Sequence, residues 1–198
     1  MNTGGRGEDL FDTGPLRLFE DAEGGVCYRP GFVDVTTAGR WFAALRVEVA
    51  WKAQRRPMYD RVVDVPRLTA AYRLDADGVP GALQEAATLL RCELHTPFNS
   101  VGLNLYRDER DSVAPHGDKL HMITAGHPIA LLSLGATRRM VIRARAPGSR
   151  QVQRVDLATG SLLLMSHASQ LTHEHAIPKQ REPVGERISL AFRVRPRA

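Results

Sequence analysis

Seven short apolar runs after residue 96 constrain the fold of this chain more than any other feature. Turn residues separate the runs, and no helical pattern is evident between them. Short β-rich segments in such close succession predict an antiparallel sandwich or barrel. The runs are SVGLNLYR, PIALLSLG, RRMVIRARA, QVQRVDLA, GSLLLMS, HEHAI and RISLAFRVR.

The first half of the chain carries a different pattern. Residues 16–33 place a Gly-Gly turn between two short apolar runs, which predicts either a pair of strands or one strand followed by a loop. From an N-cap at Thr36 or Thr37, apolar residues recur at helical spacing as far as Gln54, and a second helix is predicted over 80–95. We therefore expect an α+β fold in which N-terminal helices buttress a C-terminal β core.

No linker or internal repeat divides the sequence. Residues 1–15 are rich in Gly, Asp and Thr, which predicts a disordered tail. Residues 16–198 are expected to form a single domain, with a helical part at 16–97 and a β part at 98–198.

Composition excludes several classes of protein. No run of roughly 18 apolar residues is present, so no transmembrane helix or membrane partner is expected. The first residues lack the basic start and apolar core of a secretory signal. Cys27 and Cys92 form no C-x-x-C pair, which argues against a disulfide framework or a thiolate zinc site and favours the cytoplasm.

The net charge is +5, and arginine supplies nearly all of the excess. Arginine suits a phosphate-bearing partner. Arginine-rich composition is equally typical of proteins from GC-rich genomes, so charge alone does not assign a partner.

The triplet His116-Gly117-Asp118 offers one nitrogen and one oxygen ligand on the same side of an extended chain. By itself such a triplet is more often a polar turn than a metal site. A second histidine would complete the two-histidine, one-carboxylate triad of non-haem Fe(II) oxygenases. The candidates are His167, His173 and His175.

Arg187 and Arg193 lie six residues apart in an apolar run, so a strand would present both on one face. A buried guanidinium is suited to the carboxylate of a 2-oxo acid cosubstrate. The alternative is a half-exposed strand with solvated arginines.

These motifs resemble, in order and spacing, the AlkB family of Fe(II)/2-oxoglutarate-dependent nucleic-acid dealkylases. The resemblance runs from about Phe98 to the end, roughly half of the chain, through FNSVGLNLY, HGD, PIALLSLG, GSLLLMS, HEHAIPK and RISLAFR. It implies a double-stranded β-helix, or jelly roll, with a nucleotide-recognition lid.

Carried over by residue, the resemblance implies that His116, Asp118 and His175 bind Fe(II), with O2 as the second substrate. Arg187 would pair with the distal carboxylate of 2-oxoglutarate, and Arg193 would lie near its other end. The remaining cosubstrate contacts implied are Asn104, Tyr106, Leu131 and Ser189.

Upstream, the segment from Val65 to Tyr72 resembles the family's PR-x4-Y lid segment. Arg67 and Tyr72 are therefore candidate substrate contacts, although a structural role for either is as well supported. Leu120 stands where repair members often carry an acidic residue that reads the exocyclic amino group of the base. Because a leucine cannot accept a hydrogen bond, base selectivity is open at this position.

The resemblance also implies that an extruded base would stack on His116 on one side. Candidates for the other side are Trp51, Tyr59 and Tyr72. Candidates for the path of the nucleic-acid backbone are Arg55, Arg56, Arg61, Arg143, Arg145, Arg150 and Arg154.

The expected function is oxidative removal of N-alkyl groups, as in N1-methyladenine and N3-methylcytosine, from DNA by a monomeric repair enzyme. An oxygenase of the same fold acting on RNA, a protein or a small molecule is the alternative. A non-enzymatic cupin-like binding module would require a broken metal triad or arginine pair.

Overall fold

The computed structural model describes residues 14–58 and 61–196, and its side chains are described outside 56–64. Most of the expected tail at 1–15 and the candidate Tyr59 lie outside the described residues. None of the helices in the described part of the chain is long and apolar enough to cross a membrane.

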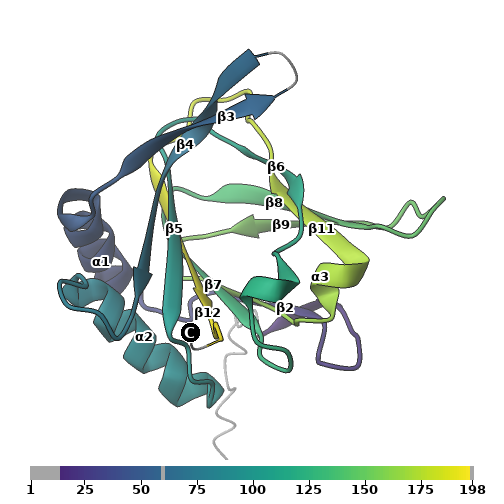
Figure 1. Ribbon diagram of the computed structural model, residues 1–198, viewed down its shortest axis with the longest axis horizontal. Coiled ribbons are helices and arrows are strands. Elements are labelled where there is room, and N and C mark those ends of the chain that lie inside the picture. The colour runs from purple at the N-terminus through teal and green to yellow at the C-terminus, as the bar shows by residue number, and fades with distance from the viewer. Residues whose placement is uncertain (1–13, 59–60, 197–198) are drawn as a thin grey trace, which may run out of the picture.

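Two antiparallel sheets face each other across an apolar core (Figure 1). The larger sheet has the order β1-β2-β10-β7-β12-β5-β4-β3 and the smaller has the order β6-β11-β8-β9. The larger sheet contains β1 (Leu16–Phe19), β2 (Val26–Arg29), β3 (Lys52–Met58), β4 (Arg61–Arg73), β5 (Ser100–Tyr106), β7 (Ile129–Gly135), β10 (Leu162–Met165) and β12 (Arg187–Arg193). The smaller contains β6 (Val113–His116), β8 (Arg138–Ala144), β9 (Val152–Leu157) and β11 (His173–Ile177).

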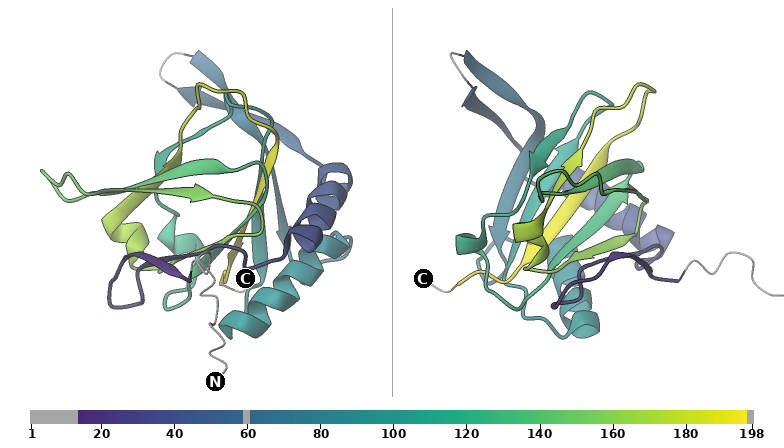
Figure 2. Two further views of the ribbon diagram at one scale, coloured as in Figure 1. Left: turned by 180° about the vertical axis from the view of Figure 1, so that it is seen from behind. Right: turned by 90° about the vertical axis from the view of Figure 1, so that its right-hand side faces the viewer.

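The helices cover the outer face of the larger sheet, as the two views in Figure 2 show. Helix α1 (Val35–Glu48) packs on β7 and on α2 (Gly81–Leu94), and a second apolar core fills this layer. The expected α+β jelly roll buttressed by N-terminal helices is confirmed. Of the two alternatives for 16–33, the structure has the strand pair, as β1 and β2.

Helix α1 differs from its prediction at both ends. Asp34, not Thr36 or Thr37, is the N-cap, and its side chain accepts a hydrogen bond of 2.9 Å from the Thr37 amide. The helix ends at Glu48, so the prediction that it continues to Gln54 is wrong. Residues from Lys52 onward instead pair with β4, where strand pairing outweighs the local helical spacing.

All seven predicted runs form strands, namely β5 and β7 to β12. The prediction that no helix lies between them is wrong in one place, because the short helix α3 (Ser169–Thr172) precedes β11. The seven runs did not include β6, which carries His116 at its end, although the metal-site prediction from the triplet assumes an extended chain at His116.

The β3–β4 hairpin is the main departure from the helical part expected at 16–97, and it projects beyond the sandwich (Figure 1). Its register shifts between Ala53 and Arg55, opposite the segment that contains Pro66. Proline removes a ladder donor, so a register irregularity is its usual place in a strand.

Candidate active site

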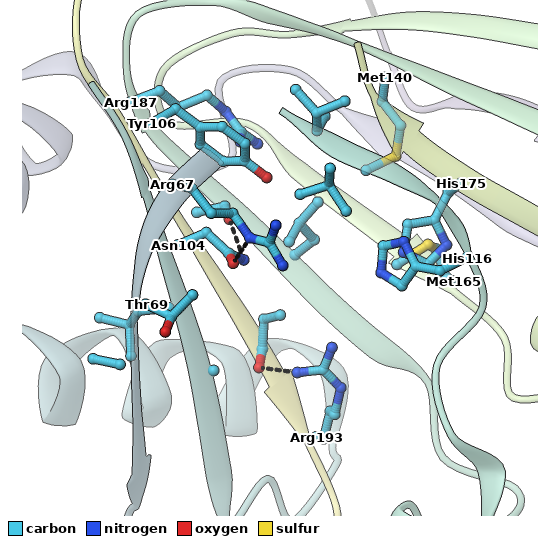
Figure 3. A pocket seen from close by; sticks show the side chains of 18 of the residues that line it. Arg67, Thr69, Asn104, Tyr106, His116, Met140, Met165, His175, Arg187 and Arg193 are labelled. Carbon is cyan, nitrogen blue, oxygen red and sulfur yellow. Dashed lines mark hydrogen bonds between the residues drawn. The ribbon is translucent and has the colours of Figure 1, made fainter. Parts of the chain in front are cut away.

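A cavity of about 340 Å³ lies between the two sheets and is lined from both (Figure 3). Alternate residues of β5 and β12 form one wall, while β6 and β11 form the other. Most of the predicted site residues meet here: Arg67, Asn104, Tyr106, His116, Leu131, His175, Arg187, Ser189 and Arg193.

The metal-ligand candidates form one cluster at the β6–β11 pairing. His116 is the register partner of His175, and their ring centroids lie 4.4 Å apart. Asp118 completes the group, in which one ligand atom from each residue lies within 4.8 Å of the others. Two imidazole nitrogens and one carboxylate oxygen fit a divalent transition metal such as Fe(II) with further positions left open.

The structure discriminates among the three C-terminal histidines. His175 joins the cluster, whereas the ring of His173 stacks on Phe19 at 3.9 Å and its Nδ1 lies 2.8 Å from Thr172 Oγ1. His167 lies outside the cluster among the described residues. His116 Nδ1 is 2.9 Å from the Ala114 carbonyl oxygen, which fixes the ring and leaves Nε2 for a metal.

The protonation states of the cluster suit metal binding. Burial works to raise the pKa of Asp118, but the charge and hydrogen bond of Arg193 lower it further, so the net pKa is below its usual value. Arg193 Nε donates to Asp118 Oδ2 at 2.7 Å. Burial lowers the pKa of His175 to about 4. The carboxylate is therefore anionic and the imidazole neutral at pH 7.

Gly117 is required by close packing around the metal-binding loop. A Cβ at this position would lie 2.6 Å from Arg145 Nη2 and 2.9 Å from the Gln170 carbonyl oxygen. Arg145 Nε donates to the His173 carbonyl at 3.1 Å, and the Gln170 side chain accepts from the Asp118 amide at 3.0 Å. Gln170 lies on α3, so the helix missed from sequence supports a candidate metal ligand.

Arg187 lies at the other end of the cavity and is fully buried. Its Nη2 donates to Ser133 Oγ at 2.9 Å, while Nε and Nη1 have no partner in the described part of the chain. Its guanidinium carbon is 5.2 Å from the centre of the Tyr106 ring. Two unpaired, buried, positively charged donors fit the distal carboxylate of 2-oxoglutarate.

The middle of the cavity is polar on one side and apolar on the other. Asn104 Oδ1 accepts from Arg67 Nε at 2.7 Å, and Asn104 Nδ2 donates to Ser189 Oγ at 3.3 Å. Arg67 also reaches the Ser112 carbonyl at 3.3 Å. Arg67 thus bridges the hairpin to a predicted cosubstrate contact. Beside the predicted Leu131, the apolar lining includes Met140 and Met165, which strand alternation in β8 and β10 could have identified.

Three predicted contacts lie away from the cavity. Tyr72 and Trp51 pack against the core beneath the helices, and Leu120 packs against the core between the sheets. Of the arginines proposed for the backbone path, Arg56 and Arg61 belong to the stretch whose side chains are not described, and Arg55, Arg150 and Arg154 are exposed.

A second hollow, of about 780 Å³, adjoins the cavity at the edge strand β6. Its lining includes Val113, His116 and Ile177, which also line the cavity. We name it the outer groove, because it also takes in Val141 and Ala176 from the opposite face of the smaller sheet. Its charged residues are Arg67, Lys119, Arg143 and Lys179, with Glu174 as the one acid among its lining residues.

Comparison with known proteins agrees with this geometry. The model of the 2OG-Fe(II) oxygenase superfamily matches residues 25–193. Alpha-ketoglutarate-dependent dioxygenase alkB homolog 3 of Mus musculus is 36% identical over 186 residues, which cover 85% of this chain and 65% of the relative. The Homo sapiens protein of the same name has the same identity and coverage. DNA oxidative demethylase ALKBH2 of Bos taurus is 36% identical over 102 residues, 48% of this chain and 37% of the relative.

The chain therefore spans slightly less than two thirds of the length of the alkB homolog 3 proteins. The family model covers most of the chain, including every cavity residue of β5 to β12. The cavity combines a His-Asp-His cluster with unpaired arginine donors among the described residues. These groups match the ligands that Fe(II) needs and the donors that the carboxylate of 2-oxoglutarate needs. By sequence and by the construction of its site, the chain belongs to the 2OG-Fe(II) oxygenase superfamily and, within it, to the AlkB-like dioxygenases.

Proposed function

We propose that this protein removes N-alkyl groups from damaged bases in DNA by oxidation, with decarboxylation of 2-oxoglutarate. The observation that carries the proposal is one cavity that joins the metal cluster to the unpaired donors of Arg187 and meets a basic groove at His116. When bound, iron with O2 and 2-oxoglutarate supplies the oxidation of the alkyl carbon, which then leaves the base as an aldehyde.

The residues of the chain bind and orient the reactants. His116, Asp118 and His175 would hold the metal, and Arg193 would keep Asp118 anionic through its 2.7 Å hydrogen bond. Arg187 would hold the distal carboxylate of the cosubstrate. Leu131, Met140 and Met165 exclude water from the space between these two ends.

Nucleic acid is the substrate class that the outer groove supports. Arg67, Lys119, Arg143 and Lys179 would meet phosphates on both sides of a base that enters the cavity past His116. The relative named DNA oxidative demethylase ALKBH2 supports DNA over RNA. We also propose that the protein acts as a monomer, because the cavity already brings together the groups that the metal and the cosubstrate need. The unpaired Cys27 and Cys92 suit the reducing cytoplasm.

The decisive experiment measures succinate and aldehyde release with oligonucleotides that carry N1-methyladenine or N3-methylcytosine. DNA and RNA, each single- and double-stranded, form the four arms. We expect turnover on DNA, its loss in His116→Ala, and its retention in His121→Ala, a control on an exposed histidine of the neighbouring 3₁₀ turn Leu120–Met122. Turnover on RNA alone would assign the alternative substrate. Succinate release without aldehyde in every arm would refute a nucleic-acid substrate of this kind.

A further inference from the structure

Arg138 is a second fully buried arginine, and the proposed chemistry does not use it. It begins β8, and its guanidinium binds three backbone carbonyls. Nη1 donates to Asp108 O at 2.9 Å, and Nη2 donates to Asp111 O at 2.8 Å and to Pro178 O at 2.9 Å. A planar fork with several donors can hold carbonyls from separate segments in one fixed arrangement.

The three carbonyls belong to segments that carry the active site. Asp108 and Asp111 lie in the connection between Tyr106, which ends β5, and β6, which ends at His116. Pro178 directly follows β11, the strand of His175. A single side chain therefore joins the cosubstrate strand to both strands that carry metal-ligand histidines.

Arg138 also contributes to the charge at the cosubstrate end. Its guanidinium carbon is 5.5 Å from the centre of the Tyr106 ring, and that of Arg187 is 5.2 Å from the same centre. Neither arginine forms an ion pair within the described residues. The nearby carboxylate of Asp111 is occupied by Arg107 at 2.8 Å. Two buried cations thus flank one aromatic ring, and among the described residues neither has a carboxylate within ion-pair distance.

Such an arrangement is costly unless an anion completes it. We propose that Arg138 is a positioning residue for the distal carboxylate of the 2-oxo acid cosubstrate. Its three carbonyl bonds fix Tyr106 and the segment after it, so that the unpaired donors of Arg187 face that carboxylate. The proposal rests on the cosubstrate named in the proposed function and is independent of the nucleic-acid substrate.

The test compares two acids on the full chain loaded with Fe(II) without oxygen. 2-Oxoglutarate has the distal carboxylate, whereas 2-oxobutyrate chelates the metal in the same way and lacks it. Binding of each acid is followed by calorimetry and by the visible absorbance of the chelate. In Arg138→Met we expect the Kd for 2-oxoglutarate to rise about tenfold, because the donors of Arg187 would no longer be held toward the distal carboxylate, and we expect the Kd for 2-oxobutyrate to be unchanged.

Arg138→Lys keeps the buried charge but cannot span three carbonyls, so we expect a smaller rise in the same Kd. If circular dichroism shows that Arg138→Met does not fold, Arg138→Lys alone tests whether Arg138 positions the cosubstrate site. Arg139→Met is the matched control, because Arg139 is the next residue on β8 but pairs with Asp156 on the surface. This control should bind both acids as the unaltered protein does.

An unchanged Kd for 2-oxoglutarate in a folded Arg138→Met protein would overturn the inference. So would an unchanged Kd in Arg138→Lys, or an equal loss of affinity for both acids, which indicates general damage. Failure of the unaltered protein to bind 2-oxoglutarate would instead count against the proposed function. The two failures are therefore distinguishable in one set of titrations.

Discussion

At one end of the cavity Asp118 meets Arg193 at 2.7 Å, whereas at the other end Arg187 lies buried with two donors unpaired. The metal end, formed by His116, Asp118 and His175, has its polar groups oriented by partners within the chain. The arginine end, formed by Tyr106, Arg138 and Arg187, instead keeps two donors of Arg187 available among the described residues. Internal partners fix the geometry for a metal, and unpaired donors select an anion.

The largest effect should come from breaking the metal end. Asp118→Asn removes the proposed anionic ligand and leaves the Arg193 guanidinium without its carboxylate partner. Loss of a mere supporting residue commonly costs about 10–100-fold in metal affinity, so loss of this ligand should cost at least about 100-fold. Anaerobic calorimetry with Fe(II) measures the change. Asp156→Asn, at an exposed ion pair, is the control and should leave the affinity unaltered.

Breaking the arginine end should have a different signature. Arg187→Met removes two donors for the cosubstrate, each worth about 1.5–3 kcal/mol as a charged hydrogen bond, so the Kd for 2-oxoglutarate should rise at least about 100-fold. Iron affinity should stay the same. The free energy of unfolding without ligands should be equal or higher, because an unpaired buried charge is replaced by an apolar side chain. Reduced iron affinity together with a lower melting temperature would contradict this reading.

Gly117→Ala tests how tightly the metal end is packed. The added methyl group meets the backbone oxygen of Gln170 at 2.9 Å, so the loop that carries His116 and Asp118 must shift. We expect iron affinity to fall roughly 10–100-fold. The ratio of the Kd for 2-oxobutyrate to the Kd for 2-oxoglutarate should not change, because the arginine end is not altered. Gly39→Ala is the control, since nothing lies within 4 Å of its added Cβ on α1. Unaltered iron affinity in Gly117→Ala would show that the loop yields freely.

Sequence was most informative where the chemistry repeats at fixed strand spacing. Arg187, Ser189 and Arg193 alternate along β12, and their side chains line one cavity as that alternation predicts. The seven apolar runs were also sufficient to predict seven of the strands, because burial of one face imposes a period of two. The motifs of the C-terminal half follow one another in the order found in the AlkB family, and this order identified the candidate metal ligands.

Sequence failed where partners come from distant segments. Nothing near Arg138 indicates that it binds carbonyls at Asp111 and Pro178, since those contacts depend on the closed sandwich. Tyr72 alternates with Arg67 across β4 and points to the helices, which a motif without a register could not reveal. The helical spacing before Gln54 was likewise overridden by pairing with β4.

The outer groove can be compared with the two ends of the cavity. We propose that it binds phosphate through its positive charge rather than through a fixed set of donors. Arg143→Gln and Lys179→Gln each remove one cation from its lining. We expect each to weaken oligonucleotide binding a few-fold and to reduce the slope of log K against log salt by about 1. Cosubstrate and iron affinities should not change. Fluorescence anisotropy over a salt series measures the slope. Arg139→Gln, on the same strand as Arg143, is the control. Equal slopes for all three variants would exclude the groove as the binding site for the oligonucleotide.

The smallest effect belongs to a charged pair that is satisfied and exposed, far from both ends of the cavity. Glu85 on α2 accepts hydrogen bonds from Arg40 and from Trp41 Nε1, and these lower its pKa from 4.5 to about 2. A depressed carboxyl pKa adds stability that is complete above about pH 4.5 and is lost as the pH falls toward 2. Glu85→Gln should therefore melt slightly below the unaltered protein at pH 7, and the difference should vanish on acidification. Glu93→Gln, at an exposed position on the same helix, is the control, and its melting temperature should follow that of the unaltered protein at both pH values. If the melting temperature of Glu85→Gln stayed lower at pH 2, packing rather than charge would hold α1 to α2.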